Sequence, residues 1–236
     1  VTVTDALIKD GRVSRGWLGV TIQDVTEDMA DAQGLEEARG AIIADVSPDS
    51  PAQSGGLQRG DIILSVNGTD TTDATSVTRL VGGLLAGSDN TFVVLRGGER
   101  ETVDVKVGER PENPNEIAAP SSSSSSKSDE NSSKDGPLGL ALRPFTDLDR
   151  DTLGLNDDEA GLMIADVDSD SPLADYDIRA GMAILSAAGT PLRSVSDLEG
   201  AISDMKDKGR DKLLLAVRNG QRTLFVTADI SDKESD

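Results

Sequence analysis

The stretch Gly40–Gly68, GAIIADVSPDSPAQSGGLQRGDIILSVNG, decides the fold of this chain. Its first apolar run, AIIADV, has the length and the β-branched residues of a strand. Pro48 and Pro51 stop that strand, because proline has no N–H group to donate to a sheet. The segment Ala52–Gly56 fits one helical turn ended by glycines, and DIILSVNG is a second strand that closes on an Asn-Gly turn. The stretch therefore predicts a strand, a short helix and a second strand.

The residues on either side complete a small module. GWLGVTIQDV, which precedes the stretch, alternates apolar and polar residues as a half-buried strand does. A longer helix is predicted over Thr75–Leu85, with Asp73 or Thr75 as its cap, because the apolar residues of this segment share one face: Val77, Leu80, Val81 and Leu84. TFVVLRGGERETVDVKV is typical of a hairpin that turns at Gly97-Gly98. We therefore expect a mixed α+β, mainly β fold, a partly open β-barrel with two helices.

The chain contains this module twice. GAIIADVSPDSPA at Gly40–Ala52 is matched by GLMIADVDSDSPL at Gly161–Leu173, a shift of 121 positions. The same shift relates Gly60 to Gly181, Leu64 to Leu185, Gly68 to Gly189, Val77 to Leu198 and Val81 to Ile202. A similarity kept over most of each half indicates a duplication. We expect a connector at 1–14, domains at 15–109 and 137–231, and a tail at 232–236.

The segment between the two copies has a different composition. Residues 110–136 are rich in Pro, Ser, Asn and charge, with a run of six serines at Ser121–Ser126. Such a segment buries too little apolar surface to offset its conformational entropy. We therefore expect a disordered linker there.

Composition excludes several classes of function. The chain has no His and no Cys, so it lacks the usual general base of serine hydrolases, thiolate nucleophiles and the commonest transition-metal ligands. We therefore predict no catalytic residue, no metal site and no cofactor. A net charge of −20 argues against nucleic acid or an anionic membrane as partner, and no apolar run has the length of a membrane span. Acidic clusters such as Asp147–Asp151 lack the ligand spacing of an EF-hand and indicate a solvated surface.

The element order and three sequence segments resemble the PDZ family. RGWLGV at Arg15–Val20 and the Gly40–Gly68 stretch are similar to the permuted PDZ arrangement in the C-terminal half of bacterial HtrA/Deg (Do-like) serine proteases, and DALIKDGRVS resembles their connector. The second copy keeps the loop GPLGLAL at Gly136–Leu142. It departs from the pattern at Gly181-Met182, where the first copy has Gly60-Asp61, and in LADYDIRAG, which has lost two glycines. These departures affect ligand binding more than the fold.

The resemblance implies a function for the chain. A tandem PDZ region of a periplasmic protease-chaperone of a Gram-negative bacterium recognises hydrophobic C-termini or unfolded segments of other proteins during protein quality control. The fragment itself is not an enzyme on this reading, while its parent is a homo-oligomeric serine endopeptidase whose protease domain is a further partner. The alternative is a structural one, in which both domains are oligomerisation or spacing elements without a peptide ligand.

The candidate site follows from the chemistry of a peptide C-terminus. Successive N–H groups of a glycine-containing loop can bind the carboxylate, and the strand that follows can pair with the peptide backbone. The candidate residues are Trp17, Leu18, Gly19, Val20 and Ile22 against Val77 and Val81 in the first domain, and Leu138, Gly139, Leu140 and Leu142 against Leu198, Ile202 and Met205 in the second. Because the walls of this predicted groove are branched aliphatic side chains without charge, we expect the last residue of the bound peptide to be Val, Leu, Ala or Phe.

Two alternatives stay open from the sequence. An apolar strand facing an apolar helix is also the ordinary pattern of a protein core, so each of these residues has a purely structural interpretation. Trp17, the only tryptophan, either lines the site, packs on the upstream connector or contacts another domain.

Overall fold

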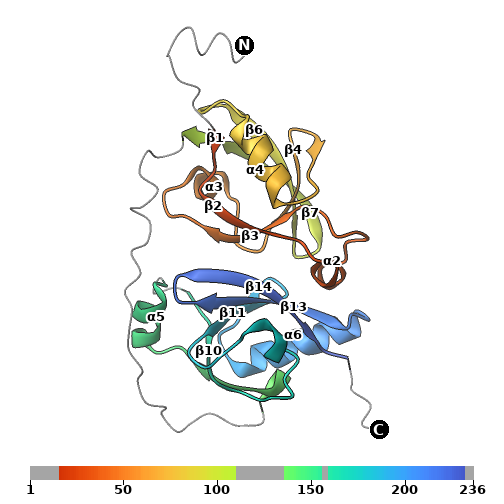
Figure 1. Cartoon of the computed structure of the whole chain (residues 1–236), viewed down its shortest axis with the longest axis vertical. Helices are drawn as coiled ribbons and strands as arrows, with labels where there is room; N and C mark the ends of the chain where they lie inside the picture. The colour runs from red at the N-terminus through yellow and green to blue at the C-terminus, as the bar shows by residue number, and fades with distance from the viewer. Residues whose placement is uncertain (1–15, 110–135, 156–158, 232–236) are drawn as a thin grey trace. The chain divides into compact units, whose positions relative to one another are not determined.

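The structure of the chain is a computed structural model that describes residues 16–109, 136–155 and 159–231. The described residues form two compact units (Figure 1), which we treat separately. The first unit contains residues 16–25 and 39–109, and the second contains residues 26–38, 136–155 and 159–231. The predicted connector, the tail and all of the predicted linker except Gly136 lie outside the described residues.

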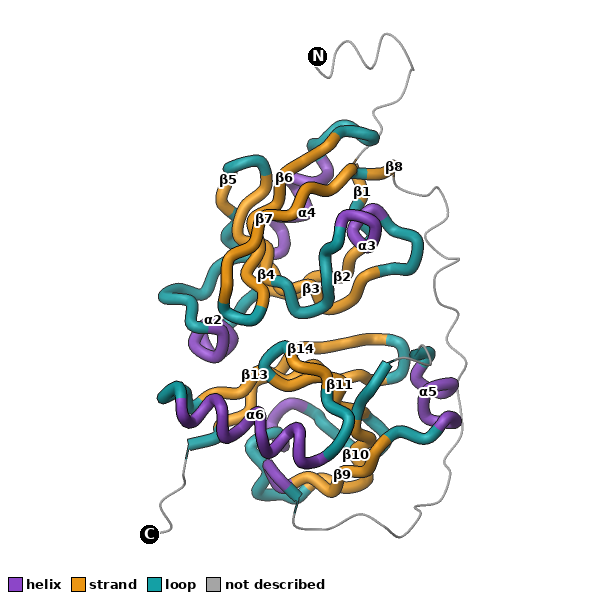
Figure 2. The backbone as a smooth tube through the Cα atoms, turned by 180° about the vertical axis from the view of Figure 1, so that it is seen from behind, coloured by secondary structure: helices purple, strands orange, loops and turns teal. Residues whose placement is uncertain are grey.

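The first unit is built on one antiparallel sheet in the order β2-β3-β4-β6-β7. Its strands are β2 (Val20–Asp24), β3 (Ala41–Val46), β4 (Ile62–Val66), β6 (Asp89–Arg96) and β7 (Glu99–Lys106), and β5 (Thr69–Asp70) pairs with β4. A separate two-stranded ladder joins β1 (Gly16–Trp17) to β8 (Gly108–Glu109), with Gly16 opposite Glu109 and Trp17 opposite Gly108. The helices are α3 (Pro51–Gly55) and α4 (Ala74–Gly82) (Figure 2).

Both helices of the first unit begin at side-chain caps. The Ser50 hydroxyl accepts the N–H of Gln53 at the start of α3. The Asp73 carboxylate accepts the N–H of Ser76 at 2.6 Å, and the Ser76 hydroxyl accepts the N–H of Asp73, which makes a capping box for α4. The helix α4 ends at Gly82, before the predicted end at Leu85, because two successive glycines weaken the last turn.

The second unit repeats the same sheet in the order β9-β10-β11-β13-β14. Its strands are β9 (Leu140–Pro144), β10 (Leu162–Val167), β11 (Ala183–Ala187), β13 (Lys212–Asn219) and β14 (Arg222–Asp229), and β12 (Thr190–Pro191) pairs with β11. The helices are α5 (Asp147–Leu153) and α6 (Val195–Asp207), with 3-10 turns η2 (Pro137–Gly139) and η3 (Ala174–Tyr176). Register shifts occur at equivalent places in the two sheets, which agrees with a duplication.

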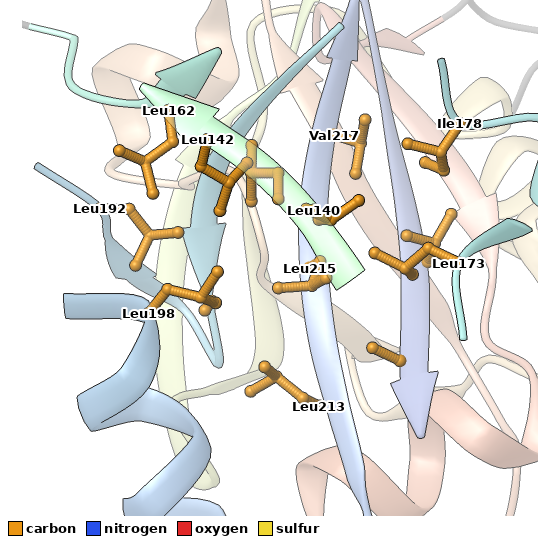
Figure 3. Close-up of a cluster of buried hydrophobic side chains, with 14 of the residues drawn as sticks. Leu140, Leu142, Leu162, Leu173, Ile178, Leu192, Leu198, Leu213, Leu215 and Val217 are labelled. Carbon is orange, nitrogen blue, oxygen red and sulfur yellow. The ribbon is translucent and has the colours of Figure 1, made fainter. Parts of the chain in front are cut away.

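Each unit has its own apolar core. The core of the first unit includes Phe92, Ile43 and Ile63, all fully buried. The core of the second is a cluster of leucines, isoleucines and valines, ten of which Figure 3 labels. Aliphatic residues therefore supply nearly all of the packing, as a chain with only 2% aromatic residues requires.

The predicted fold class, mixed α+β and mainly β, is confirmed, but two short helices were not predicted. The helix α2 (Glu27–Gln33) follows β2 in the chain, and its residues group with the second unit; α5 follows β9. Thr26 caps α2 and Thr146 caps α5, and each helix is followed by a glycine with positive φ, Gly34 or Gly154. In the described part of the chain, no helix is both long and apolar enough to cross a membrane.

Candidate peptide-binding groove

A groove of about 300 Å³ lies between β2 and α4 in the first unit. Seven of its lining residues are those that the sequence predicts, so the fold brings the whole first-domain set together. Three further residues were not predicted, Gly16, Thr78 and Gly82, although Thr78 and Gly82 follow Val77 and Val81 directly on α4. The groove is lined by Gly16, Trp17, Leu18, Gly19, Val20, Ile22, Val77, Thr78, Val81 and Gly82.

The loop at one end of this groove offers backbone N–H groups. The carbonyl of Leu18 accepts the N–H of Ala52 at 2.9 Å, and the carbonyl of Gly19 accepts the N–H of Ser47 at 2.8 Å. The N–H groups of Leu18 and Gly19 donate to no acceptor among the described residues. The loop is thus fixed through its carbonyls, while its donors stay available.

The N–H of Val20 adds a third donor. Val20 lies opposite Val46 in the antiparallel ladder, and the adjacent residues Gly19 and Ser47 are joined by a bond from Ser47 N–H to Gly19 O. Because the bond lies beside the pair, Val20 and Val46 form a non-hydrogen-bonded pair. The N–H of Val20 therefore points away from β3, toward the open edge of the sheet. Consecutive N–H groups without an acceptor are the donor set from which an anion-binding concavity can be built.

Gly19 is required at the centre of this loop for two reasons. Its φ is +76°, a left-handed conformation that glycine adopts without strain. A Cβ atom at this position would lie 2.5 Å from Cβ of Ser50 and 2.9 Å from Cη2 of Trp17. The half-buried ring of Trp17 therefore packs directly on the loop and lines the groove, the first of the three roles open to it.

The walls of the groove combine core and surface. Leu18, Val77 and Val81 belong to the apolar core and are at most 7% exposed, so the structural interpretation also holds for them. Val20 and Ile22 are half-buried, and Thr78 is exposed at the lip. None of the described residues that line the groove is charged. A hydrophobic side chain entering it meets an apolar floor without desolvating a charge.

The residues predicted for the second domain also come together, but they are packed more tightly. Leu140, Leu142, Leu198 and Met205 are at most 6% exposed, and Leu138 and Ile202 pack against the same cluster. A pocket beside β9 is lined instead by Gly139, Ala141 and residues 166–169. Most of the predicted second site therefore belongs to the core of the second unit.

Two ion pairs with a buried aspartate, Asp61 with Arg96 and Asp149 with Arg143, involve no residue that lines the groove. Asp61, 1% exposed, accepts two hydrogen bonds from the guanidinium of Arg96 in the first unit. In the second unit the guanidinium of Arg143, together with hydrogen bonds from Thr146, lowers the pKa of Asp149 to about 2. Among the described residues there is no group of three or more Asp or Glu side chains arranged to hold a metal ion. These pairs therefore stabilise the fold.

Comparisons with known proteins fit this geometry. Residues 16–107 match the PDZ domain family. Over 231 residues the chain is 33% identical to a protein of Rhizobium meliloti named "Probable periplasmic serine endoprotease DegP-like", covering 97% of this chain and 44% of the relative. A protein of the same name from Bartonella henselae is 35% identical over 234 residues, covering 98% and 43%. A solved structure of the "HtrA-type protease AlgW with decapeptide" is 37% identical and covers 46% of this chain and 34% of that one, with a TM-score of 0.40.

The fold and the groove define a PDZ-type peptide-binding domain, and residues 16–107 form one. Over nearly its whole length the chain is a homologue of the DegP-like proteins of the HtrA family. It spans less than half the length of these relatives. The predicted family and the predicted periplasmic localisation are confirmed, the latter because the relatives are named periplasmic endoproteases.

Proposed function

We propose that the first unit binds the C-terminal end of other polypeptides whose last residue is hydrophobic. The observation that carries this proposal is the loop Leu18–Val20, at the end of an uncharged groove, whose three consecutive N–H groups have no acceptor in the described part of the chain. A peptide C-terminus matches both features, because the loop offers donors to an anion and the groove offers apolar walls to a hydrophobic side chain.

The carboxylate of a peptide C-terminus would use the N–H groups that the loop Leu18–Val20 leaves without an acceptor. An ionised carboxylate that leaves water must regain hydrogen bonds, and the penalty for leaving it without partners is large. Hydrogen bonds from backbone N–H groups to an ionised acceptor are stronger than those to a neutral carbonyl. Because the carbonyls of Leu18 and Gly19 are already bonded to Ala52 and Ser47, the loop keeps its shape whether or not a ligand is present.

The backbone of the peptide would pair with the open edge of β2. The strand β2 is the last strand of its sheet, so its outer edge faces no further strand among the described residues. An extended peptide between β2 and α4 would add one strand to the sheet, and its main-chain hydrogen bonds would not depend on sequence. This mode also admits unfolded segments, although they lack the bond to the loop unless they end there.

The groove walls account for the terminal side chain. Leu18, Val20 and Ile22 from one side and Val77 and Val81 from the other present only aliphatic carbon. Burial of a terminal aliphatic side chain contributes about 2 kcal/mol, which a charged residue would forfeit. A terminal Val, Leu, Ala or Phe is therefore expected.

We extend the proposal to the longer protein. The relatives that match this chain are named periplasmic serine endoproteases, and they are more than twice its length. In a protein of that kind the first unit would deliver exposed C-termini or unfolded segments to an attached protease domain within a homo-oligomer, as part of protein quality control. The present chain would act in recognition and regulation rather than in catalysis.

A direct titration tests the binding step. Trp17, the only tryptophan, lines the groove, so its fluorescence reports on ligands at this site. We expect a ten-residue peptide ending in Val to change this fluorescence saturably, and the same peptide with an amidated C-terminus to bind at least tenfold more weakly. Thr78→Glu, at an exposed position on the lip, should weaken binding by repelling the carboxylate without unfolding the unit. Equal affinity for the acid and the amide would refute the carboxylate mechanism.

The structural alternative makes a different prediction. If the units served only as oligomerisation or spacing elements, no peptide would change the fluorescence of Trp17. Light scattering of the chain with and without residues 137–231 would then show a difference in oligomeric state. The tight packing of the predicted second site favours such a role for the second unit more than for the first.

A further inference from the structure

The loop of the second unit has the same register as the loop of the first but uses its donors differently. Leu140 lies opposite Val167, and Asp168 N–H donates to Gly139 O at 2.8 Å, so the N–H of Leu140 points outward as that of Val20 does. In this unit, however, it donates to the carbonyl of Pro137. The N–H of Gly139 donates to the carbonyl of Gly136 at 3.2 Å. Two of the three potential carboxylate donors therefore already have partners.

The backbone conformation of Leu138 produces this arrangement. Leu138 has φ +62° and ψ +22°, in the left-handed region, which a leucine adopts only when its surroundings hold it there. Leu18, the equivalent residue, is not among the positive-φ residues of the first unit. The left-handed residue closes the 3-10 turn η2, and the turn takes up the N–H groups that would otherwise face a ligand.

The left-handed conformation of Leu138 is held by a serine hydroxyl that has a different hydrogen-bond partner in the two units. In the first unit the carbonyl of Leu18 accepts Ala52 N–H, and the Ser50 hydroxyl caps α3. In the second unit the helix is reduced to η3, and the hydroxyl of Ser171, the counterpart of Ser50, donates to the carbonyl of Leu138 at 2.7 Å. The second unit lacks the two glycines of AQSGGLQRG and has η3 in place of the helix. Ser171, which no longer caps a helix, instead bonds to the loop.

The space of the groove is filled as well. Leu140 is 0% exposed, Leu142 6% and Met205 3%, whereas their counterparts Val20, Ile22 and Leu84 are half-buried. Figure 3 shows Leu140 and Leu142 in one apolar cluster with Leu198, Leu213 and Leu215.

The helix α6 supplies part of this filling. It continues through Ser203-Asp204, where α4 ends at Gly82-Gly83, and the extra turn carries Met205 into the core.

The charge at the lip of the groove also differs. Glu199 occupies the position of Thr78, and both side chains are exposed. The second helix therefore carries a carboxylate at a position where the first helix has a neutral side chain. A carboxylate ligand would be repelled by Glu199, since like charges in proximity disfavour the ionised form.

We infer that the tandem has a single site for a peptide C-terminus, in the first unit, because the second unit satisfies its loop donors and fills its groove with its own chain. This inference rests on the function proposed above for the first unit. It makes the two copies equivalent in fold and distinct in binding, with a stoichiometry of one peptide carboxylate per chain.

The experiment uses the full chain labelled with ¹⁵N and a ten-residue peptide that ends in Val. Calorimetry should give one peptide per chain, and backbone amide shifts should move at residues 18–22 and 77–82 but not at 138–142 or 198–205. A matched pair of variants exchanges the lip residues. Thr78→Glu should weaken binding at least tenfold, whereas Glu199→Thr should leave affinity and stoichiometry unchanged.

Each other outcome has a definite meaning. Two sites per chain, or ligand-dependent shifts at residues 138–142, would overturn the single-site inference and leave the proposed function of the first unit intact. No binding at either unit would refute the proposed function together with the inference. A gain of a second site in Glu199→Thr would show that charge alone closes the second groove, and would contradict the inference that the bonded loop and the filled groove close it.

Discussion

The carboxylate of Asp24, at the end of β2, accepts a hydrogen bond of 2.7 Å from the backbone N–H of Ala74, the first residue of α4. The two residues belong to β2 and α4, the elements that supply the opposite walls of the groove, and Ala74 precedes Val77 by about one helical turn. The bond joins the edge strand to the helix at the end away from the loop Leu18–Val20. It therefore fixes the separation of the walls between which the peptide is proposed to lie. The second unit has Pro144 at the position of Asp24, so it has no equivalent side chain to accept this bond.

We predict that Asp24→Ala lowers both stability and affinity. Loss of a hydrogen bond to a helix N-terminus costs about 1 kcal/mol. Because the walls are then held at one end only, we also expect peptide affinity to fall severalfold. Urea denaturation and the Trp17 titration measure the two effects. Asp89→Ala, at another exposed aspartate, is the control and should change neither. A loss of stability at unchanged affinity would show that the bond does not set the groove width.

We predict that Gly19→Ala is more harmful than Gly56→Ala. Both glycines have positive φ, +76° and +86°, so both variants incur about 1 kcal/mol of backbone strain. A Cβ at Gly56 meets nothing within 4 Å, whereas at Gly19 it collides with Ser50 and Trp17. The difference between the two free energies of unfolding, from urea denaturation, isolates that collision. Peptide binding should be lost in the first variant and kept in the second; equal effects would contradict the crowding at Gly19.

We predict strong coupling between Asp61 and Arg96. Asp61 is 1% exposed and accepts from Nε and Nη2 of Arg96 at 2.7 and 2.6 Å. Removing one partner leaves the other charge partly buried, so Asp61→Ala should destabilise the first unit by about 3 kcal/mol. The double variant Asp61→Met with Arg96→Met should lose less than the sum of the single variants, as a double-mutant cycle by urea denaturation would show. Additive effects would mean that the pair is not coupled.

We predict an acid-sensitive contribution from Asp149. Hydrogen bonds from Arg143 and Thr146 lower its pKa from 3.8 to about 2 in the folded chain. A depressed pKa stabilises the fold above the unfolded value and loses that effect as pH falls through the folded value. The contribution, about 2 kcal/mol, should therefore be complete above about pH 5 and be lost progressively between about pH 5 and pH 1. Asp149→Asn should flatten the dependence of the unfolding free energy on pH in that window, and an unchanged slope would rule out this assignment.

The sheet could be predicted because its signals are local. Alternation in GWLGVTIQDV, the Asn67-Gly68 turn and the Gly97-Gly98 turn each specify a strand or a hairpin without reference to the rest of the chain. The caps of α2 and α5, Thr26 with Gly34 and Thr146 with Gly154, were also present in the sequence. They mark helices of only seven residues, whose pattern is too short to separate from a loop.

The residues of the candidate site could be predicted from the sequence, but whether the N–H groups of each loop are free or already bonded could not. Sequence spacing is enough to bring Leu18, Val20 and Val81 together, and it also brings Leu138, Leu140 and Ile202 together. It does not reveal that Leu138 is left-handed, since leucine seldom adopts that conformation and no glycine marks the position. Whether an N–H group is free or already bonded depends on such dihedral angles, so the difference between the two loops became visible only in three dimensions.

The ladder between β1 and β8 has a consequence for how the first unit is used as a building block. Gly16 stands opposite Glu109, so the stretch of chain from residue 16 to residue 109, which includes α2, begins and ends at neighbouring points. A segment with adjacent ends can be placed within a loop of another protein without stretching either partner. Residues 16–109 are therefore suited to transfer as one continuous segment, and in a host enzyme both ends of that segment would lie beside Trp17, next to the loop where a ligand is proposed to bind.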